Sequence, residues 1–280
     1  MNTALKQQQF DELKAIAEQY SLPEYYVWSF EYFLDQVDFR GKRVLEIGGS
    51  SLPKELFDSL AVEQWICVDI LDHDAGGYQT ADSEIQVVKM KELECIENDK
   101  YAIIDGDMCD FPVHISDHFD VIVTVNCMEH VINMSRFLRA AHNTLKIDGE
   151  FLASFGPLWS CAAGSHFWGA TDWDFNKPGS IEEWDHLLLR PAQLLEKIIA
   201  SGVDAECAEN VIVQIYHSPR INRLFYSDYV AYLNNSSFRS YDVTTHYRID
   251  PNPEKLKALQ TKYGADEDFS AYSLIATAVK

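Results

Sequence analysis

The sequence predicts an α/β fold built on a doubly wound, mostly parallel sheet. Two observations carry this prediction. Short apolar segments alternate with helical ones between residues 43 and 155, and the segment 119–125 (FDVIVTV) is apolar almost throughout. Strands covered by helices on both faces have such continuous apolar runs. Alternation of strands with helices is typical of parallel sheets whose strands are connected by crossover helices.

Seven segments have the composition of strands. They are residues 43–47, 64–70, 101–104, 119–125, 150–155, 211–216 and 272–279. A helix is expected after Pro53, because the first turn of a helix tolerates proline, and another begins at Pro191. A further helix is expected over 134–145, where Phe137, Leu138 and Ala141 share one face. Residues 1–40 are expected to form an N-terminal helical cap, since apolar residues recur there at helical spacing. Residues 41–280 then form one domain around the sheet.

Two long segments interrupt this alternation. Residues 157–186 are rich in Trp, Gly, Asp and His and lack periodicity, and residues 219–265 are expected to be partly helical. Segments of this length inside a compact domain are usually functional or form a lid. We therefore expect two insertions that, together with the N-terminal helices, close over the carboxyl edge of the sheet.

The net charge of −21 limits the classes of partner. A surface this acidic repels a phosphate backbone and an anionic lipid surface, so neither nucleic acid nor a membrane is expected as a partner. A small molecule is the expected ligand. The many aromatic residues (14 Tyr, 15 Phe and 6 Trp) are compatible with a homodimer.

The cysteines and the N-terminal sequence predict a cytoplasmic location. Six cysteines are scattered without a C-x-x-C pair, which is typical of a reducing compartment and of neither a disulfide framework nor a zinc site. The first residues, MNTALKQQQFDELK, lack the apolar core of a signal peptide. No apolar run has the length needed to cross a bilayer.

A glycine turn after the first strand predicts a ligand site. Glu46-Ile47-Gly48-Gly49-Ser50 joins the strand to a helix, and glycines there let the backbone approach a ligand closely. Asp69 ends the next strand, where a carboxylate can accept hydrogen bonds from a ribose diol. Taken alone, the Gly-Gly-Ser turn is equally compatible with a purely structural role.

Several motifs in order resemble those of class I S-adenosylmethionine-dependent methyltransferases. Residues 44–49 (VLEIGG) are similar to the first motif of this family, and Asp69 matches its ribose-binding acid. Gly106-Asp107-Met108 resembles the motif that contacts adenine, and 126–131 (NCMEHV) resembles the fourth motif. The resemblance covers about residues 42–156. It implies a Rossmann-like sheet of seven strands, the last of them antiparallel, with S-adenosylmethionine as the cofactor.

The resemblance also implies a set of cofactor-binding residues. They are Glu46, Gly48, Gly49, Ser50, Asp69, Ile70, Asp107, Met108, Asn126 and Cys127. The chain departs from the family pattern where Ser50 and Leu52 replace the second and third glycines. This departure keeps open a non-catalytic S-adenosylmethionine-binding protein. A NAD-type dehydrogenase shares the sheet, but the motifs at 106–108 and 126–131 argue against it.

Methyl transfer to a hydroxyl group requires a base near the lid, and three histidines are candidates. His130 follows the fourth strand, His166 lies in the first insertion, and His186 has an adjacent acid. Each also has a structural interpretation, as a helix start, a surface-loop residue and a cap. Five side chains of the first insertion have the chemistry of metal ligands: Asp172, Asp174, Asp185, His166 and His186. Because their spacing follows no metal motif, no metal is predicted.

The first insertion gives an indication of which molecule accepts the methyl group. Its elements Trp159-Ser160, Gly164-Ser165-His166 and Trp184-Asp185-His186 loosely resemble methyltransferases of bacterial polysaccharide and sugar modification. This resemblance implies O-methylation of a sugar, a sugar nucleotide or a related small molecule. Methylation of a small-molecule nitrogen stays open as an alternative, because a nitrogen acceptor depends less on a base.

Overall fold

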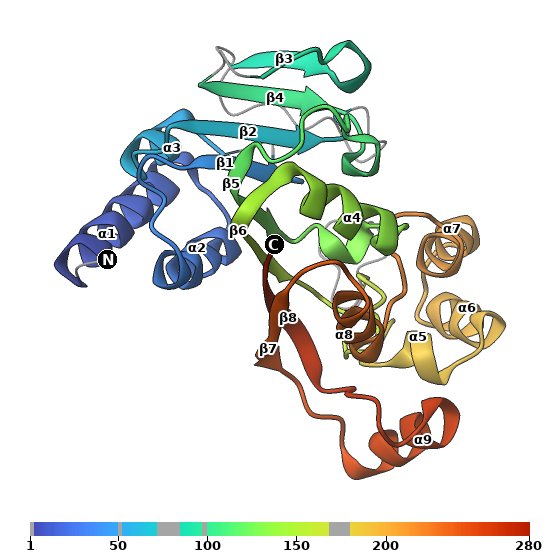
Figure 1. Ribbon diagram of the computed structural model, residues 1–280. Helices are drawn as coiled ribbons and strands as arrows, with labels where there is room; N and C mark the ends of the chain where they lie inside the picture. The colour runs from blue at the N-terminus through green and yellow to red at the C-terminus, as the bar shows by residue number, and fades with distance from the viewer. Residues whose placement is uncertain (1–2, 50–51, 72–84, 97–99, 168–179) are drawn as a thin grey trace.

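The computed structural model describes residues 3–49, 52–71, 85–96, 100–167 and 180–280. Within these residues a single eight-stranded sheet has the order β3-β4-β2-β1-β5-β6-β8-β7 (Figure 1). The strands are β1 (Arg43–Ile47), β2 (Gln64–Asp69), β3 (Gln86–Lys89), β4 (Tyr101–Asp105), β5 (Phe119–Val125), β6 (Leu145–Phe155), β7 (Ser240–Arg248) and β8 (Ala271–Val279). The first six run parallel, whereas β8 pairs antiparallel with both β6 and β7.

The α-helices lie between and beyond these strands. They are α1 (Thr3–Tyr20), α2 (Glu24–Gln36), α3 (Lys54–Ser59), α4 (Met134–Thr144), α5 (Asp185–Leu188), α6 (Pro191–Ala200), α7 (Ala205–Tyr216), α8 (Tyr226–Asn234) and α9 (Pro253–Tyr263). The described residues also form the short 3-10 helices η1 (Met90–Glu92), η2 (Met108–Asp110) and η3 (Met128–His130). The predicted α/β, Rossmann-like fold class is confirmed.

The predicted count of seven strands is wrong in two respects. Residues 211–216, expected as a strand, belong to helix α7, in which Ala208, Val211 and Ile215 are buried at helical spacing. Asp204 caps that helix by accepting hydrogen bonds from two backbone N–H groups. The strands β3 and β7 were not predicted, because both lie at sheet edges and most of their residues are exposed.

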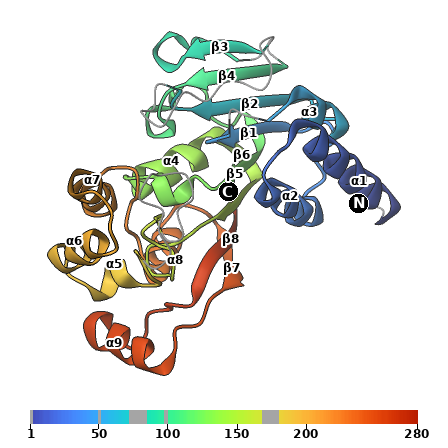
Figure 2. The same cartoon turned by 180° about the vertical axis from the view of Figure 1, so that it is seen from behind.

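Helices cover both faces of the sheet. Alternate strand residues such as Val44 and Trp65 pack with Phe30 and Phe33 of α2 on one face. Their neighbours face α4 and α8 on the other side. The N-terminal helices α1 and α2 therefore cover a face of the sheet, whereas the sequence suggested the carboxyl edge (Figure 2).

Helices α5, α6, α7 and α9, which we call the lid, have a hydrophobic core of their own. This core includes Trp184, Leu194, Ile215 and Leu259, all nearly fully buried. The lid helices group at the opposite side of the molecule from α1 and α2 in both views (Figures 1 and 2). Residues of both predicted insertions thus meet in one helical unit.

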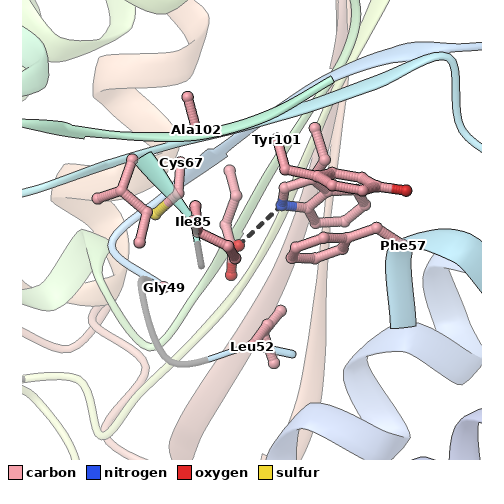
Figure 3. A pocket seen from close by; sticks show the side chains of 10 residues that line it. Gly49, Leu52, Phe57, Cys67, Ile85, Tyr101 and Ala102 are labelled. Carbon is pink, nitrogen blue, oxygen red and sulfur yellow. Dashed lines mark hydrogen bonds between the residues drawn. The ribbon is translucent and has the colours of Figure 1, made fainter. Parts of the chain in front are cut away.

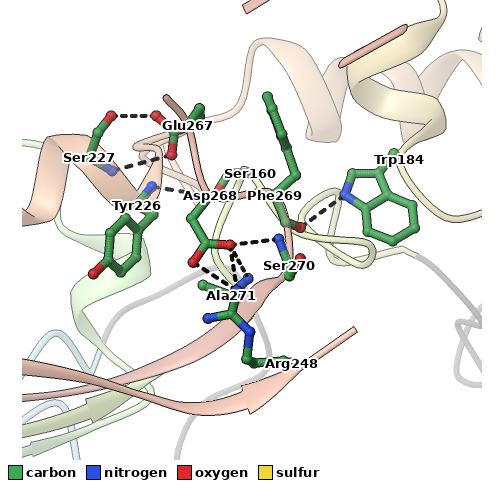
Figure 4. A network of polar contacts seen from close by, with 10 residues as sticks. All are labelled: Ser160, Trp184, Tyr226, Ser227, Arg248, Glu267, Asp268, Phe269, Ser270 and Ala271. Carbon is green, nitrogen blue, oxygen red and sulfur yellow. Dashed lines mark hydrogen bonds and ion pairs between the residues drawn. The ribbon is translucent and has the colours of Figure 1, made fainter. Parts of the chain in front are cut away.

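A polar network ties the lid to the end of the sheet (Figure 4). Asp268 accepts hydrogen bonds from the backbone N–H groups of Ser270 (2.9 Å) and Ala271 (3.1 Å), and it forms an ion pair with Arg248 at 3.0 Å. In the next residue, the Phe269 carbonyl accepts from the Trp184 indole N–H at 3.2 Å. The start of β8 is therefore fixed to both β7 and the lid.

Candidate functional site

The glycine turn after β1 lies against the turn after β5. Gly48 has a φ of +78°, and its N–H donates to the Val68 carbonyl at 2.9 Å. A Cβ at Gly48 would lie 2.5 Å from Sγ of Cys127. Both the backbone conformation and the close approach therefore require glycine at this position.

Glu46 lies beneath the same turn and is buried, with only 2% of its surface exposed. Its Oε2 accepts a hydrogen bond from Nε1 of Trp65 at 2.9 Å (Figure 3). A Cβ at Gly49 would lie 1.8 Å from its Oε1. Burial raises the pKa of Glu46 well above its usual value. The cavity drawn in Figure 3 has a volume of about 10 Å³, which is room for about one water molecule.

Acidic residues end β2 and β4, two strands that lie on the same side of β1. Asp69 ends β2, and its Oδ1 accepts from the N–H of Ile70 at 2.8 Å. Asp105 ends the neighbouring strand β4, where it pairs with Lys89 and accepts from the N–H of Leu71 at 3.1 Å. The hydrogen bond with Lys89 lowers the pKa of Asp105. Sequence reasoning named Asp69 and Ile70 but did not identify this bracing role of Asp105.

The turn after β4 carries the pair expected to contact adenine. Asp107 is exposed and caps η2, because its Oδ1 accepts from the N–H of Cys109 at 2.8 Å. Met108, the first residue of η2, has its side chain buried in the core. The carboxylate of Asp107 and the backbone of η2 thus border the carboxyl edge, while the Met108 side chain faces the core.

The turn after β5 links two strands. Asn126 has a φ of +46°, and its N–H donates to the Ser154 carbonyl of β6 at 2.8 Å. Cys127 then packs against Gly48. Burial raises the pKa of the Cys127 thiol, so this residue stays neutral at physiological pH.

These residues fit S-adenosylmethionine in their chemistry. The carboxylates of Asp69 and Asp107 suit the ribose hydroxyls and the adenine amino group, and Gly48 and Gly49 let the turn between them pack closely on Cys127 and Glu46. Ser50, also expected here, lies outside the described residues.

Two of the three candidate histidines lie together beyond the end of β5. The rings of His130 and His166 have centroids 5.2 Å apart. His130 is exposed, and its Nδ1 bonds the backbone carbonyl of Arg220. Because a carbonyl oxygen only accepts, Nδ1 carries a proton, and in the neutral form of the ring the lone pair is on Nε2. Within the described part of the chain, no hydrogen bond engages His130 Nε2.

His166 has a different environment. Its Nε2 donates to the Pro157 carbonyl at 3.1 Å, which leaves the lone pair on Nδ1. Burial, and then the nearby charge of His130, lower the pKa of His166 to about 3. His166 is therefore neutral at physiological pH.

His186 belongs to the lid core. It is 2% exposed, its Nε2 donates to the Trp159 carbonyl at 2.8 Å, and burial lowers its pKa to about 4. The adjacent Asp185 pairs with Lys197 at 2.7 Å. No cluster of three or more metal-ligating side chains occurs in the described ranges, and Asp172 and Asp174 fall outside them.

Sequence reasoning missed the partners that hold the turn bearing His130. Asn222 donates to the carbonyls of Met128 (2.7 Å), Glu129 (3.0 Å) and Val131 (3.1 Å). The buried Glu129 carboxylate accepts from the Gly156 N–H at 3.3 Å. No sequence signal pointed to Asn222, since it lies in a segment without periodicity.

Comparison with known proteins identifies the domain. Residues 45–153, from β1 to β6, match a family model described as a methyltransferase domain. This match covers all the expected cofactor-binding residues. It confirms the expected S-adenosylmethionine-dependent methyltransferase and its cofactor. No curated protein matches the sequence.

Solved structures resemble the chain at low identity. An S-adenosylmethionine-dependent methyltransferase from Archaeoglobus fulgidus is 12% identical, with 96% of this chain and 99% of that chain covered and a TM-score of 0.45. One from Mesorhizobium loti is also 12% identical, with 90% and 98% covered and a TM-score of 0.46. In the part of the chain that the structure describes, no helix is long and apolar enough to cross a membrane.

Proposed function

We propose that this S-adenosylmethionine-dependent methyltransferase methylates a hydroxyl group of a sugar, a sugar nucleotide or a related small molecule, with His130 as the base. One observation carries the proposal. The Nδ1–H of His130 is held by the Arg220 carbonyl, so the free lone pair of an exposed imidazole lies just beyond β5. A neutral imidazole with its lone pair available has the form required of a general base.

The cofactor supplies an electrophilic methyl group when it is bound. Asp69 and Asp107 would hold its ribose and adenine, and the backbone of Gly48 and Gly49 would border the remainder. We propose that Glu46 acts indirectly, since its buried carboxyl supports the turn from beneath. Met108, Ile70, Asn126 and Cys127 would shape the same edge.

His130 Nε2 would accept the proton of the acceptor hydroxyl as the hydroxyl oxygen bonds to the methyl carbon. The bond of that carbon to the sulfonium sulfur would break in the same step, with S-adenosylhomocysteine as the leaving group. The carbonyl of Arg220 would then stabilise the imidazolium through Nδ1–H. His166 is a weaker candidate, because an imidazole with a pKa of about 3 is a poor proton acceptor. His186 lies buried in the lid and would support its fold.

The proposed sugar-like acceptor rests on the three elements that resemble sugar-modifying enzymes. These three elements lie together in the structure, although 24 residues lie between Trp159 and Trp184 along the chain. The backbone N–H of Trp184 donates to the Ala162 carbonyl at 3.0 Å, and the His186 ring donates to the Trp159 carbonyl. They form one buried scaffold that carries His166 beside His130.

The test is methyl transfer to a panel of sugars and sugar nucleotides, with products located by mass spectrometry and NMR. His130→Gln is expected to lower kcat/KM by about 10²- to 10⁴-fold, the usual contribution of a general base. The matched control is His114→Gln, since His114 is an exposed histidine whose ring also bonds a backbone carbonyl, that of Glu94. Full activity of His130→Gln, or a product methylated on nitrogen, would contradict the proposal.

A further inference from the structure

The turn that carries His130 has little structure of its own. η3 is a single 3-10 turn, held internally by hydrogen bonds from the His130 N–H to the Cys127 carbonyl (2.9 Å) and from the Val131 N–H to the Met128 carbonyl (3.2 Å). A turn this short does not hold one geometry without outside contacts. The position of His130 must therefore be set by whatever binds the carbonyls of η3.

Asn222 binds three carbonyls of this turn, two in η3 and one in Val131, the residue that follows it. Its backbone N–H donates to Glu129 at 3.0 Å, and its side-chain Nδ2 donates to Met128 at 2.7 Å and Val131 at 3.1 Å. Both protons of the amide group are thus used on one turn. In the same segment, the Arg220 carbonyl accepts from His130 Nδ1, so a single stretch of chain contacts both the turn and its imidazole.

The orientation of the Asn222 amide is fixed from the other side. Its Oδ1 accepts from the Leu224 N–H and from the Tyr229 hydroxyl, each at 3.0 Å. Tyr229 is 1% exposed, so its hydroxyl is anchored in the core by α8. The amide therefore donates two hydrogen bonds through Nδ2 and accepts two through Oδ1, which is its full hydrogen-bonding capacity. A flipped amide would place oxygen against two carbonyls.

The segment itself is braced by Arg223. Its guanidinium donates to four backbone carbonyls, those of Gln214, Ile215, Ser218 and Ile221, at distances from 2.8 to 3.4 Å. Two of these carbonyls belong to the end of α7 in the lid. The stretch from Arg220 to Asn222 is therefore joined to the lid on one side and to η3 on the other.

We infer that Asn222 is a positioning residue for methyl transfer, which fixes η3 so that the Arg220 carbonyl holds the proton on His130 Nδ1. This inference rests on the proposed function, since it assigns Asn222 a role in presenting the Nε2 lone pair. Asn222 touches neither reacting atom. It acts through the backbone carbonyls of η3 and through the spacing between the Arg220 carbonyl and the imidazole.

The test uses Asn222→Asp, which keeps the shape of the side chain and replaces its two donors with an acceptor. Asn235→Asp is the matched control, because Asn235 is an exposed residue at the end of α8. We expect Asn222→Asp to lower kcat for the acceptor by about 10- to 100-fold, the loss typical of a base misplaced by about 1 Å. Its affinity for S-adenosylhomocysteine should match that of the unaltered protein.

Nitrogen-15 NMR of the His130 ring gives a readout independent of activity. The unaltered protein should show protonated Nδ1 and free Nε2, and Asn222→Asp should show a mixture of the two tautomers. In the double variant His130→Gln/Asn222→Asp, kcat should be no lower than in His130→Gln alone. An unchanged tautomer and pH profile in Asn222→Asp would overturn the inference.

The two proposals fail in different ways. If His130→Gln keeps full activity while Asn222→Asp still changes the tautomer, the base assignment is wrong and the positioning stands. If Asn222→Asp does not fold, Tyr229→Phe removes one hydrogen bond to Oδ1 and leaves the Asn222 donors in place. That variant should shift the same tautomer signal to a smaller extent, and no shift would count against the inference.

Discussion

Substituting Gly49 with alanine tests how the glycine turn is built. The new Cβ would lie 1.8 Å from Oε1 of Glu46, whereas ordinary van der Waals contact begins at 3.4 Å. The carboxyl group cannot easily yield, because its other oxygen is bonded to Trp65, whose ring stacks on Phe57 at 4.4 Å. The backbone of the turn must therefore move. Overpacking of this kind costs about 1 to 3 kcal/mol.

That strain should appear in cofactor binding. A cost of about 1 to 3 kcal/mol corresponds to a loss of roughly 5- to 150-fold in affinity for S-adenosylhomocysteine, measured by isothermal titration calorimetry. Gly264→Ala is the matched control, because a Cβ there meets nothing within 4 Å and only its φ of +109° is strained. It should lower thermal stability and leave affinity unchanged. Unaltered affinity in Gly49→Ala would refute this account of the turn.

Three further predictions concern single side chains. Asp69→Ala should weaken S-adenosylhomocysteine binding by roughly 10- to 100-fold in the same titration, because a charged hydrogen bond to the ribose is lost. Arg223→Met should lower the free energy of unfolding in urea by about 2 to 4 kcal/mol, since four backbone carbonyls lose their donor. His186 has a pKa lowered to about 4, so its contribution to stability is complete above the unfolded value of about 6.5 and is lost as pH falls towards 4. Between these pH values, the unfolding free energy of the unaltered protein should fall more steeply than that of His186→Gln, by up to about 1.4 kcal/mol per pH unit. Equal slopes would contradict the buried neutral state.

The parallel half of the sheet was predictable from sequence because its strands are buried on both faces. In a chain where strands alternate with helices, a continuous apolar run such as 119–125 indicates a strand at the centre of a parallel sheet. The prediction of a strand over 211–216 was wrong because its β-branched residues favour strands. In the structure, Val211 and Ile215 pack in the hydrophobic core of the lid, and this packing favours a helix. Strand β7 could not be predicted because its residues are mostly exposed and polar.

The site was predictable only where chain-local motifs define it. The glycine turn, Asp69 and the turn after β5 lie in contiguous motifs, so their place at the carboxyl edge follows from the topology. The hydrogen bonds of His130 with Arg220 and of Met128 with Asn222 join segments about 90 residues apart in sequence. Such long-range hydrogen bonds leave no pattern in a single sequence.

The central claim is that the carboxyl edge binds S-adenosylmethionine. The most direct measurement is calorimetric titration of the folded, cofactor-stripped protein with S-adenosylhomocysteine, repeated with NAD. We predict micromolar binding of S-adenosylhomocysteine and no binding of NAD. A protein that is folded by circular dichroism but fails to bind S-adenosylhomocysteine would contradict the account.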